Sequence, residues 1–235
     1  MSTVAKLLFF TASTFLIGAV GIHRANLRST PEKRRERWIK LGGYFAVVHG
    51  VLLCAWLGRA ALAALFLLVV VAGGRELVRA RAHALTLTSY AALGACLIGF
   101  VLRAAPQTTI YVYLVVAAFD GFSQVTGESL GHHRLAPRVS PQKTVEGALG
   151  GLVAAIFTGL VLRPLPDLDW LPATAASGLA SAAALGGDLT ASWVKRRSGI
   201  KDFGDLLPGP GGILDRFDSF LAAGACALFL SRTAP

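Results

Sequence analysis

Charged residues are scarce in this chain. Asp, Glu, Lys and Arg make up 15% of its 235 residues, whereas apolar residues make up 54%. Soluble domains usually carry about 25% charged residues, so this composition excludes an ordinary soluble protein and indicates an integral membrane protein. Acids are the rarer sign, with 13 Asp and Glu against 23 Lys and Arg, and the formal net charge is +10.

Motifs of several common protein classes are absent. Cys54, Cys96 and Cys226 lie in apolar stretches without C-x-x-C spacing or a neighbouring histidine, so we expect small buried side chains there. The adjacent His132 and His133 lack the i, i+4 spacing of a zinc pair. Neither a P-loop nor a G-x-G-x-x-G element after a strand is found. No small-residue cleavage site follows the first apolar stretch, so we interpret it as an uncleaved membrane helix.

Long apolar stretches are abundant. A helix needs about 20 residues to cross about 30 Å of hydrocarbon. Eight stretches approach that length, approximately residues 4–22, 38–57, 60–73, 86–102, 107–122, 146–163, 170–190 and 214–231. The predicted fold class is therefore an all-α integral membrane protein, a polytopic bundle of about eight transmembrane helices.

The basic residues are distributed unevenly between the connecting segments. If the segment between the first two helices is cytoplasmic, only Lys6, Arg59, Arg103, Arg163 and Arg232 fall on the other side. This positive-inside pattern predicts a multi-pass protein of the cell (inner) membrane, with both termini outside. Topology and anionic headgroups explain the positive surplus, so we expect a lipid bilayer and no nucleic acid as partner.

Carboxylates gather at one level of the predicted bundle. Five acids fall at predicted cytoplasmic helix ends, namely Asp120, Glu146, Asp188, Asp215 and Asp218. Asp215 and Asp218 are three residues apart, which places them on one helix face. Hard oxygen ligands of this kind suit Mg²⁺, which completes its shell with water and substrate phosphates. We therefore predict a divalent cation site at the inner leaflet.

Phosphate-binding groups lie near these acids. The segment between Asp188 and Asp215 supplies hydroxyl, cationic and glycine residues, namely Ser192, Lys195, Arg196, Arg197, Lys201, Gly211 and Gly212. Cations can neutralise a polyphosphate, and glycine backbone can present N–H groups to it. A second polar loop, residues 127–147, adds Lys143 and Thr144, and its Ser140–Pro141 pair resembles a capped helix start. The combination favours nucleotide chemistry at a membrane surface.

Over about residues 115–220 the sequence resembles the phosphatidate cytidylyltransferase (CDP-diacylglycerol synthase) family. The family's S-x-x-K-R, K-D-x-G and P-x-H-G-G-x-x-D-R-x-D elements are matched by Ser192, Lys195, Arg196, Lys201, Asp202, Gly204, Pro208, Gly211, Gly212, Asp215, Arg216 and Asp218. Its S-P-x-K-T-x-E-G element is matched by Ser140, Pro141, Lys143, Thr144, Glu146 and Gly147, with Asp120 upstream. Three positions depart from the family pattern. Pro210 stands where the family has His, and Gln124 and Glu128 differ from the residues usual at their positions.

The resemblance implies transfer of CMP from CTP to phosphatidate, giving CDP-diacylglycerol and pyrophosphate in phospholipid biosynthesis. It implies that Asp188, Asp215 and Asp218 hold Mg²⁺, with or without a second, monovalent cation, and that Lys195 is catalytic. The implied substrate-binding residues are Ser192, Arg196, Lys201, Asp202, Lys143, Thr144, Ser140, Asp120, Glu146, Arg216, Gly211 and Gly212. A homodimer is suggested by the likeness alone.

The predicted bundle divides into two parts. Residues 1–105 are expected to form a membrane-helix scaffold, and residues 106–235 the catalytic region of one membrane domain. Three alternatives stay open at this point: a related transferase or kinase acting on an isoprenoid alcohol or another lipid phosphate, an ion-conducting protein, and an inactive scaffold. Polar residues deep inside the helices would favour ion conduction, whereas here they gather at one interface.

Overall fold

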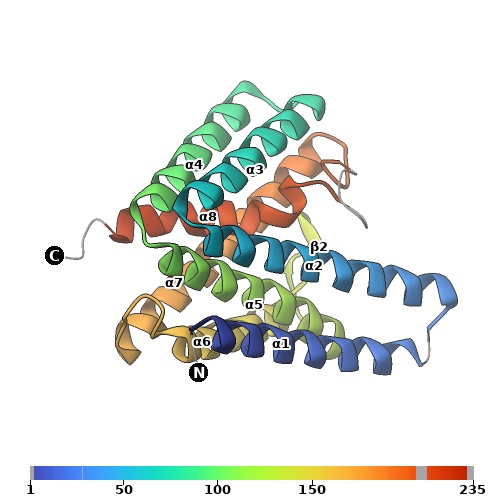
Figure 1. Cartoon of the computed structure of the whole chain (residues 1–235). Helices are drawn as coiled ribbons and strands as arrows, with labels where there is room; N and C mark the ends of the chain where they lie inside the picture. Colours follow the sequence, from blue (N-terminus) through green and yellow to red (C-terminus); the bar gives the residue numbers. More distant parts are fainter. Residues whose placement is uncertain (1–2, 28, 205–210, 232–235) are drawn as a thin grey trace.

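The computed structural model describes residues 3–27, 29–204 and 211–231, and these form a helical bundle with one small hairpin (Figure 1). The helices are α1 (Thr3–Asn26), α2 (Pro31–Leu57), α3 (Arg59–Arg79), α4 (Ala84–Arg103), α5 (Pro106–Leu130), α6 (Val145–Leu162), α7 (Trp170–Arg197) and α8 (Leu214–Ser231). Each predicted apolar stretch coincides with one of them, which confirms the all-α polytopic fold class. Arg28 lies outside the described residues, as do three residues named in the sequence analysis, namely Pro208, Pro210 and Arg232.

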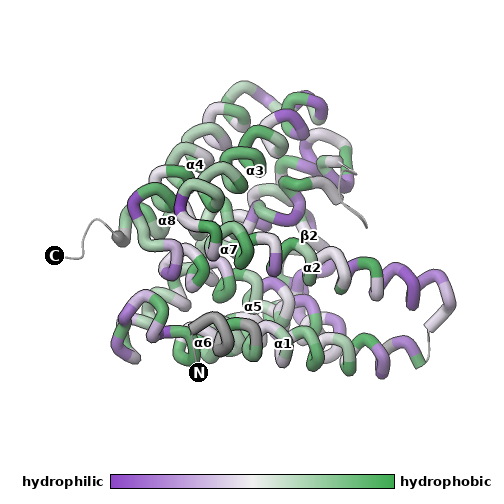
Figure 2. The backbone as a smooth tube through the Cα atoms, in the orientation of Figure 1, coloured by the Kyte–Doolittle hydropathy of each residue, from purple (hydrophilic) through white to green (hydrophobic). Residues whose placement is uncertain are grey.

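The apolar composition of the helices fits a bilayer. Among the described residues, α2, α3, α4, α5 and α6 are each long and apolar enough to cross a membrane. At about 1.5 Å per residue, the 27 residues of α2 extend about 40 Å, which exceeds the hydrocarbon thickness. Its first turns are hydrophilic and project beyond the bundle together with the end of α1 (Figure 2). The three cysteines are unpaired and half-buried within helices.

Three helices continue past their predicted ends. Helix α3 ends at Arg79 rather than near residue 73, α5 at Leu130 rather than near 122, and α7 at Arg197 rather than near 190. Hydropathy marks where the lipid ends, but backbone hydrogen bonding continues into the polar interface. The extension of α7 therefore places residues expected in a loop on a helix.

The second polar loop forms a hairpin instead of an early helix start. Strand β1 (Arg134–Ala136) pairs antiparallel with β2 (Ser140–Thr144), so the predicted helix start at the Ser140–Pro141 pair is wrong. Helix α6 begins at Val145, and the Thr144 hydroxyl accepts a hydrogen bond from the Gly147 N–H at 3.1 Å. Thr144 directly precedes the apolar run, so it is the residue able to cap the helix.

Helix α5 lies at the centre of the bundle and contributes the most continuous buried segment, residues 109–116. Helices α6, α7 and α8 pack against it, and α3 and α4 cover the outer side of α8 (Figure 1). Phe66 of α3 contacts Phe217 and Phe220 of α8. Gly187 of α7 lies against the Asp218 backbone, which brings the polar ends of α7 and α8 together.

Candidate active site

One face of α7 carries three polar residues toward the hairpin and α8. Asp188, Ser192 and Lys195 follow one another at i, i+4 and i+7 and therefore share a helix face. The Ser192 hydroxyl donates to Asp188 Oδ1 at 3.3 Å. The Lys143 ammonium of β2 forms an ion pair with Asp188 Oδ2, and both side chains are about three-quarters buried. This pair joins the hairpin to α7.

The carboxylate of Asp215 is held from three directions. Lys195 Nζ donates to its Oδ1 at 2.7 Å. The backbone N–H groups of Phe203 and Gly212 donate to its Oδ2 at 2.8 Å each. The Lys195 and Asp215 side chains are only 14% and 9% exposed, so this ion pair is shielded from water. It connects the end of α7 to the start of α8.

Three further carboxylates meet between α5, α7 and α8. The Asp218 carboxylate interacts electrostatically with Asp188, Asp120 and Lys195. The Ser219 hydroxyl donates to Asp218 Oδ1 at 3.5 Å, and Lys143 lies within electrostatic range of the Asp120 carboxylate. The structure therefore brings Asp120, Asp188, Asp215 and Asp218 into one connected network, as the sequence predicted for these acids.

This acid cluster, defined as Asp120, Asp188, Asp215 and Asp218, is chemically suited to a divalent cation. Lys143 and Lys195 are the ammonium groups paired with it, which leaves more carboxylates than ammonium groups. Half-buried excess negative charge is costly unless a cation neutralises it. Within the described residues no three His, Cys, Asp or Glu side chains form a metal cage. Mg²⁺ needs none, because one or two carboxylates, water and substrate phosphates complete its shell.

Two predicted cationic site residues contact α2 and the hairpin. The Arg216 guanidinium lies over the Tyr44 ring of α2 at 4.8 Å. Arg196 Nε donates to the Val139 carbonyl oxygen in the hairpin at 3.4 Å. Helices α7 and α8 and strand β2 thus each contribute a cationic side chain, namely Arg196, Arg216 and Lys143.

Four predicted residues lie further out or have structural contacts. Lys201 and Asp202 are exposed, and Lys201 lies within electrostatic range of Glu36 on α2. Ser140 is half-buried in β2. Thr144, described above as the cap of α6, is buried against Gly127 and Gly131. Their predicted roles in substrate binding stay predictions.

Glu146 lies apart from the acid cluster. Its carboxylate contacts His133 Nδ1 at 2.5 Å and accepts the backbone N–H of His132 at 3.1 Å and of His133 at 3.2 Å. These contacts close the base of the hairpin onto α6. The structure thus places Glu146 beside the hairpin that carries Lys143 rather than among the other acids.

The glycine pair before α8 is fixed by close contacts. Gly211 has a φ of 104°, which favours glycine, and a Cβ there would meet Asp215 Cβ at 3.0 Å. The Gly212 N–H donates to Asp215 in this structure rather than into open space. Both glycines therefore allow the chain to fold tightly over the start of α8.

A buried acid from the N-terminal half also reaches this turn. Glu76 of α3 is 1% exposed, and its Oε1 and Oε2 accept the backbone N–H groups of Ile213 and Leu214 at 2.9 Å each. Sequence reasoning missed it because the third apolar stretch was ended near residue 73. An acid that follows the apolar run and Gly73–Gly74–Arg75 was the available signal, since acids in membrane helices are rare and usually functional.

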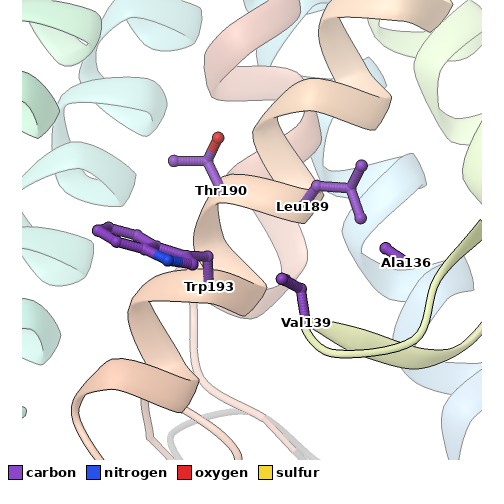
Figure 3. A pocket seen from close by; sticks show the side chains of 5 residues that line it. All are labelled: Ala136, Val139, Leu189, Thr190 and Trp193. Carbon is purple, nitrogen blue, oxygen red and sulfur yellow. The ribbon is translucent and has the colours of Figure 1, made fainter.

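A shallow, mainly apolar pocket of about 240 Å³ lies beside the acid cluster, between α7 and the hairpin. Leu189, Thr190 and Trp193 line it from α7, and Ala136 and Val139 line it from the hairpin (Figure 3). Leu189 directly follows Asp188, and the guanidinium of Arg197 lies 5.2 Å from the Trp193 ring. Apolar and cationic surfaces thus adjoin at one place.

An apolar helical bundle whose carboxylates and ammonium groups meet between α5, α7, α8 and the hairpin defines a polytopic membrane protein with one polar site. The model of the cytidylyltransferase family matches residues 84–234, which include α4 to α8 and the whole acid cluster. The chain belongs to this family.

Curated relatives match about half of the chain. A phosphatidate cytidylyltransferase of Brucella abortus is 45% identical over 121 residues, which cover 50% of this chain and 44% of the relative. Proteins with the same name from Staphylococcus epidermidis and Staphylococcus saprophyticus are 42% and 43% identical over 115 residues, again 44% of each relative. The matched part is thus less than half the length of these relatives.

Proposed function

We propose that this protein is a CTP:phosphatidate cytidylyltransferase, which transfers CMP from CTP to phosphatidate. One observation carries the proposal: a shielded Lys195–Asp215 pair adjoins further acids from α5, α7 and α8 within the region shared with the family. The names of the curated relatives support the choice of CTP and phosphatidate.

The proposed reaction is an in-line displacement at phosphorus. A phosphatidate oxygen forms a bond to the α-phosphorus of CTP, and the bond from that phosphorus to the bridging oxygen breaks. The electron pair leaves with pyrophosphate. Because the attacking phosphate is already ionised, the site needs no strong base. Its tasks are to orient two anions and to neutralise charge as pyrophosphate departs.

Carboxylates and ammonium groups divide these tasks. Asp188, Asp215 and Asp218 are the residues proposed to hold Mg²⁺, which when bound would neutralise and orient the triphosphate. Lys143 and Lys195 would contact phosphate oxygens from opposite sides of the cluster. Ser192 restrains Asp188, because its hydroxyl donates to that carboxylate.

The lipid is proposed to approach sideways from the bilayer. The apolar pocket formed by Leu189, Trp193 and Val139 would accept the part of the lipid nearest its glycerol. Arg196 and Arg197, at the end of α7, would attract its phosphate. The acyl chains would stay in the membrane. The positive-inside pattern supports an entrance on the cytoplasmic side.

The proposal is tested with the purified full-length chain in lipid nanodiscs containing phosphatidate, CTP and Mg²⁺. Pyrophosphate release and CDP-diacylglycerol formation are measured together. We expect both products from the parent and a loss of about 10²-fold or more in Asp188→Asn, since removing a charge-stabilising group typically costs that much. Asp169→Asn is the matched control, because Asp169 is exposed at the opposite end of α7.

The result separates the proposal from its alternatives. Equal turnover in the parent and Asp188→Asn would contradict the site assignment. Turnover of CTP with a polyprenyl phosphate but not with phosphatidate would replace the lipid substrate. Ion flux in liposomes without any nucleotide turnover would point to an ion-conducting protein instead.

A further inference from the structure

We infer that Glu76, which lies outside the family match at residues 84–234, is a positioning residue for the active site. It fixes the turn that presents Asp215 and the start of α8. This inference rests on the proposed function for its kinetic consequence, although its structural consequence can be measured separately.

The first support is the geometry of the α8 start. The first N–H groups of a helix have no partner within the helix and need one from elsewhere. Here Gly212, Ile213 and Leu214 are consecutive donors. Asp215 accepts from Gly212, and Glu76 accepts from Ile213 and Leu214. A side chain 137 residues away in sequence therefore supplies the cap, and its negative charge also complements the helix dipole.

The second support is the fit around the Glu76 carboxylate. A Cβ at Gly204 would lie 2.8 Å from Glu76 Oε1, and a Cβ at Gly212 would overlap the same carboxylate. Gly204 and Gly212 therefore both leave room for one buried acid. Phe203, next to Gly204, donates its N–H to Asp215. Movement of Glu76 would consequently move both backbone donors that hold Asp215.

The third support is the cost of burying the acid. Glu76 is 1% exposed in an apolar helix, where an ionisable group is expensive and is normally retained for a role. Neutral residues could fill the same volume without that cost. The position of Glu76 also affects that of Lys195, because the Lys195 ammonium lies 2.7 Å from Asp215 Oδ1. The N-terminal helices thus contribute directly to the geometry of the site.

The structural test compares hydrogen exchange in the parent, Glu76→Gln and the control Glu128→Gln, a matched change at an exposed position of α5. Gln has nearly the same shape as Glu. Its NH₂ group is a donor, however, and would face one of the two backbone N–H groups of Ile213 and Leu214, which needs an acceptor. We expect exchange of the Gly212–Leu214 amides to accelerate about tenfold to hundredfold in Glu76→Gln, the equivalent of losing hydrogen bonds to a charged group. Exchange in α5 and α6 should be unchanged. Unchanged exchange at residues 212–214 would overturn the inference.

The kinetic test distinguishes positioning from folding. In Glu76→Gln we expect kcat/KM for CTP to fall about tenfold or more, with a raised KM, in protein whose thermal unfolding shows it fully folded. A purely structural role would reduce the amount of active enzyme and leave KM unchanged, which would contradict positioning. If the parent does not turn over CTP, the proposed function fails, while the exchange comparison still decides the role of Glu76.

A double variant provides an independent test through the glycine contact. Gly212→Ala should accelerate exchange of the turn in the parent, because the added methyl group displaces the Glu76 carboxylate. In a Glu76→Ala background the same substitution should have little further effect, because the space is open. Equal and additive effects in both backgrounds would show that the two residues act separately and would overturn the inference.

Discussion

At the scale of single residues, the site depends on charges that are shielded from water. The Lys195–Asp215 pair is the most enclosed, and each partner also limits where the other can move. Removing one member of such a pair costs far more than the pair contributes, because the remaining charge stays buried without compensation. The same side chains therefore affect both stability and the proposed chemistry.

We predict that Lys195→Met lowers both activity and stability. Asp215 would keep two backbone N–H donors but lose its counter-ion, so we expect a loss of about 3 kcal/mol in the free energy of unfolding. Activity should fall about 10²-fold. Thermal unfolding in detergent and pyrophosphate release measure the two effects. Arg163→Met is the control, since Arg163 is exposed at the C-terminal end of α6 and has no role in the proposed site. Equal effects of both substitutions would contradict this prediction.

At the scale of elements, the close contact of α5 and α6 positions the hairpin. Gly151 of α6 lies where a Cβ would meet the Phe119 backbone oxygen at 2.6 Å and would overlap the Ser123 hydroxyl. Small residues let two helix backbones approach closely, which is how membrane helices associate without a hydrophobic driving force. Asp120 directly follows Phe119, so this contact also fixes one acid of the cluster.

We predict that Gly151→Ala destabilises the bundle, because the backbones of α5 and α6 must separate to admit the methyl group. A melting temperature several degrees lower, equivalent to about 1 to 3 kcal/mol, is expected by analogy with overpacked cores. Val153→Leu, which faces outward at 69% exposure, should change the melting temperature little. An unchanged melting temperature for Gly151→Ala would show that the two helices are less tightly packed than the structure indicates.

Local sequence patterns predicted the apolar helices better than they predicted the helix ends. Apolar runs identified all eight helices, because hydropathy reports contact with lipid directly. The ends of α3 and α7 were missed because polar residues can continue a helix beyond the hydrocarbon. For that reason Glu76 was assigned to a loop, and Ser192 and Lys195 were separated from the helix they share with Asp188. The hairpin was missed because Thr144 and Ser140 both resemble helix caps.

At the scale of the whole molecule, the sequence predicted five acids at one level, and the structure connects four of them but not Glu146. The connected acids are Asp120, Asp188, Asp215 and Asp218. Their distances depend on packing between helices far apart in sequence. No local pattern specifies that Glu76 binds the turn before α8, or that Glu146 turns toward His133.

The orientation of the whole bundle yields the final prediction. From the Lys and Arg distribution we predict that the hairpin lies in the cytoplasm and the connection between α6 and α7 outside. In a background with the native cysteines replaced, Asp169→Cys should react with a membrane-impermeant maleimide on intact cells. Gln142→Cys, at an exposed position of β2, should react only after the cells are permeabilised. The reverse pattern would place the acid cluster outside the cell, where CTP is not supplied by metabolism, and would contradict the proposed function.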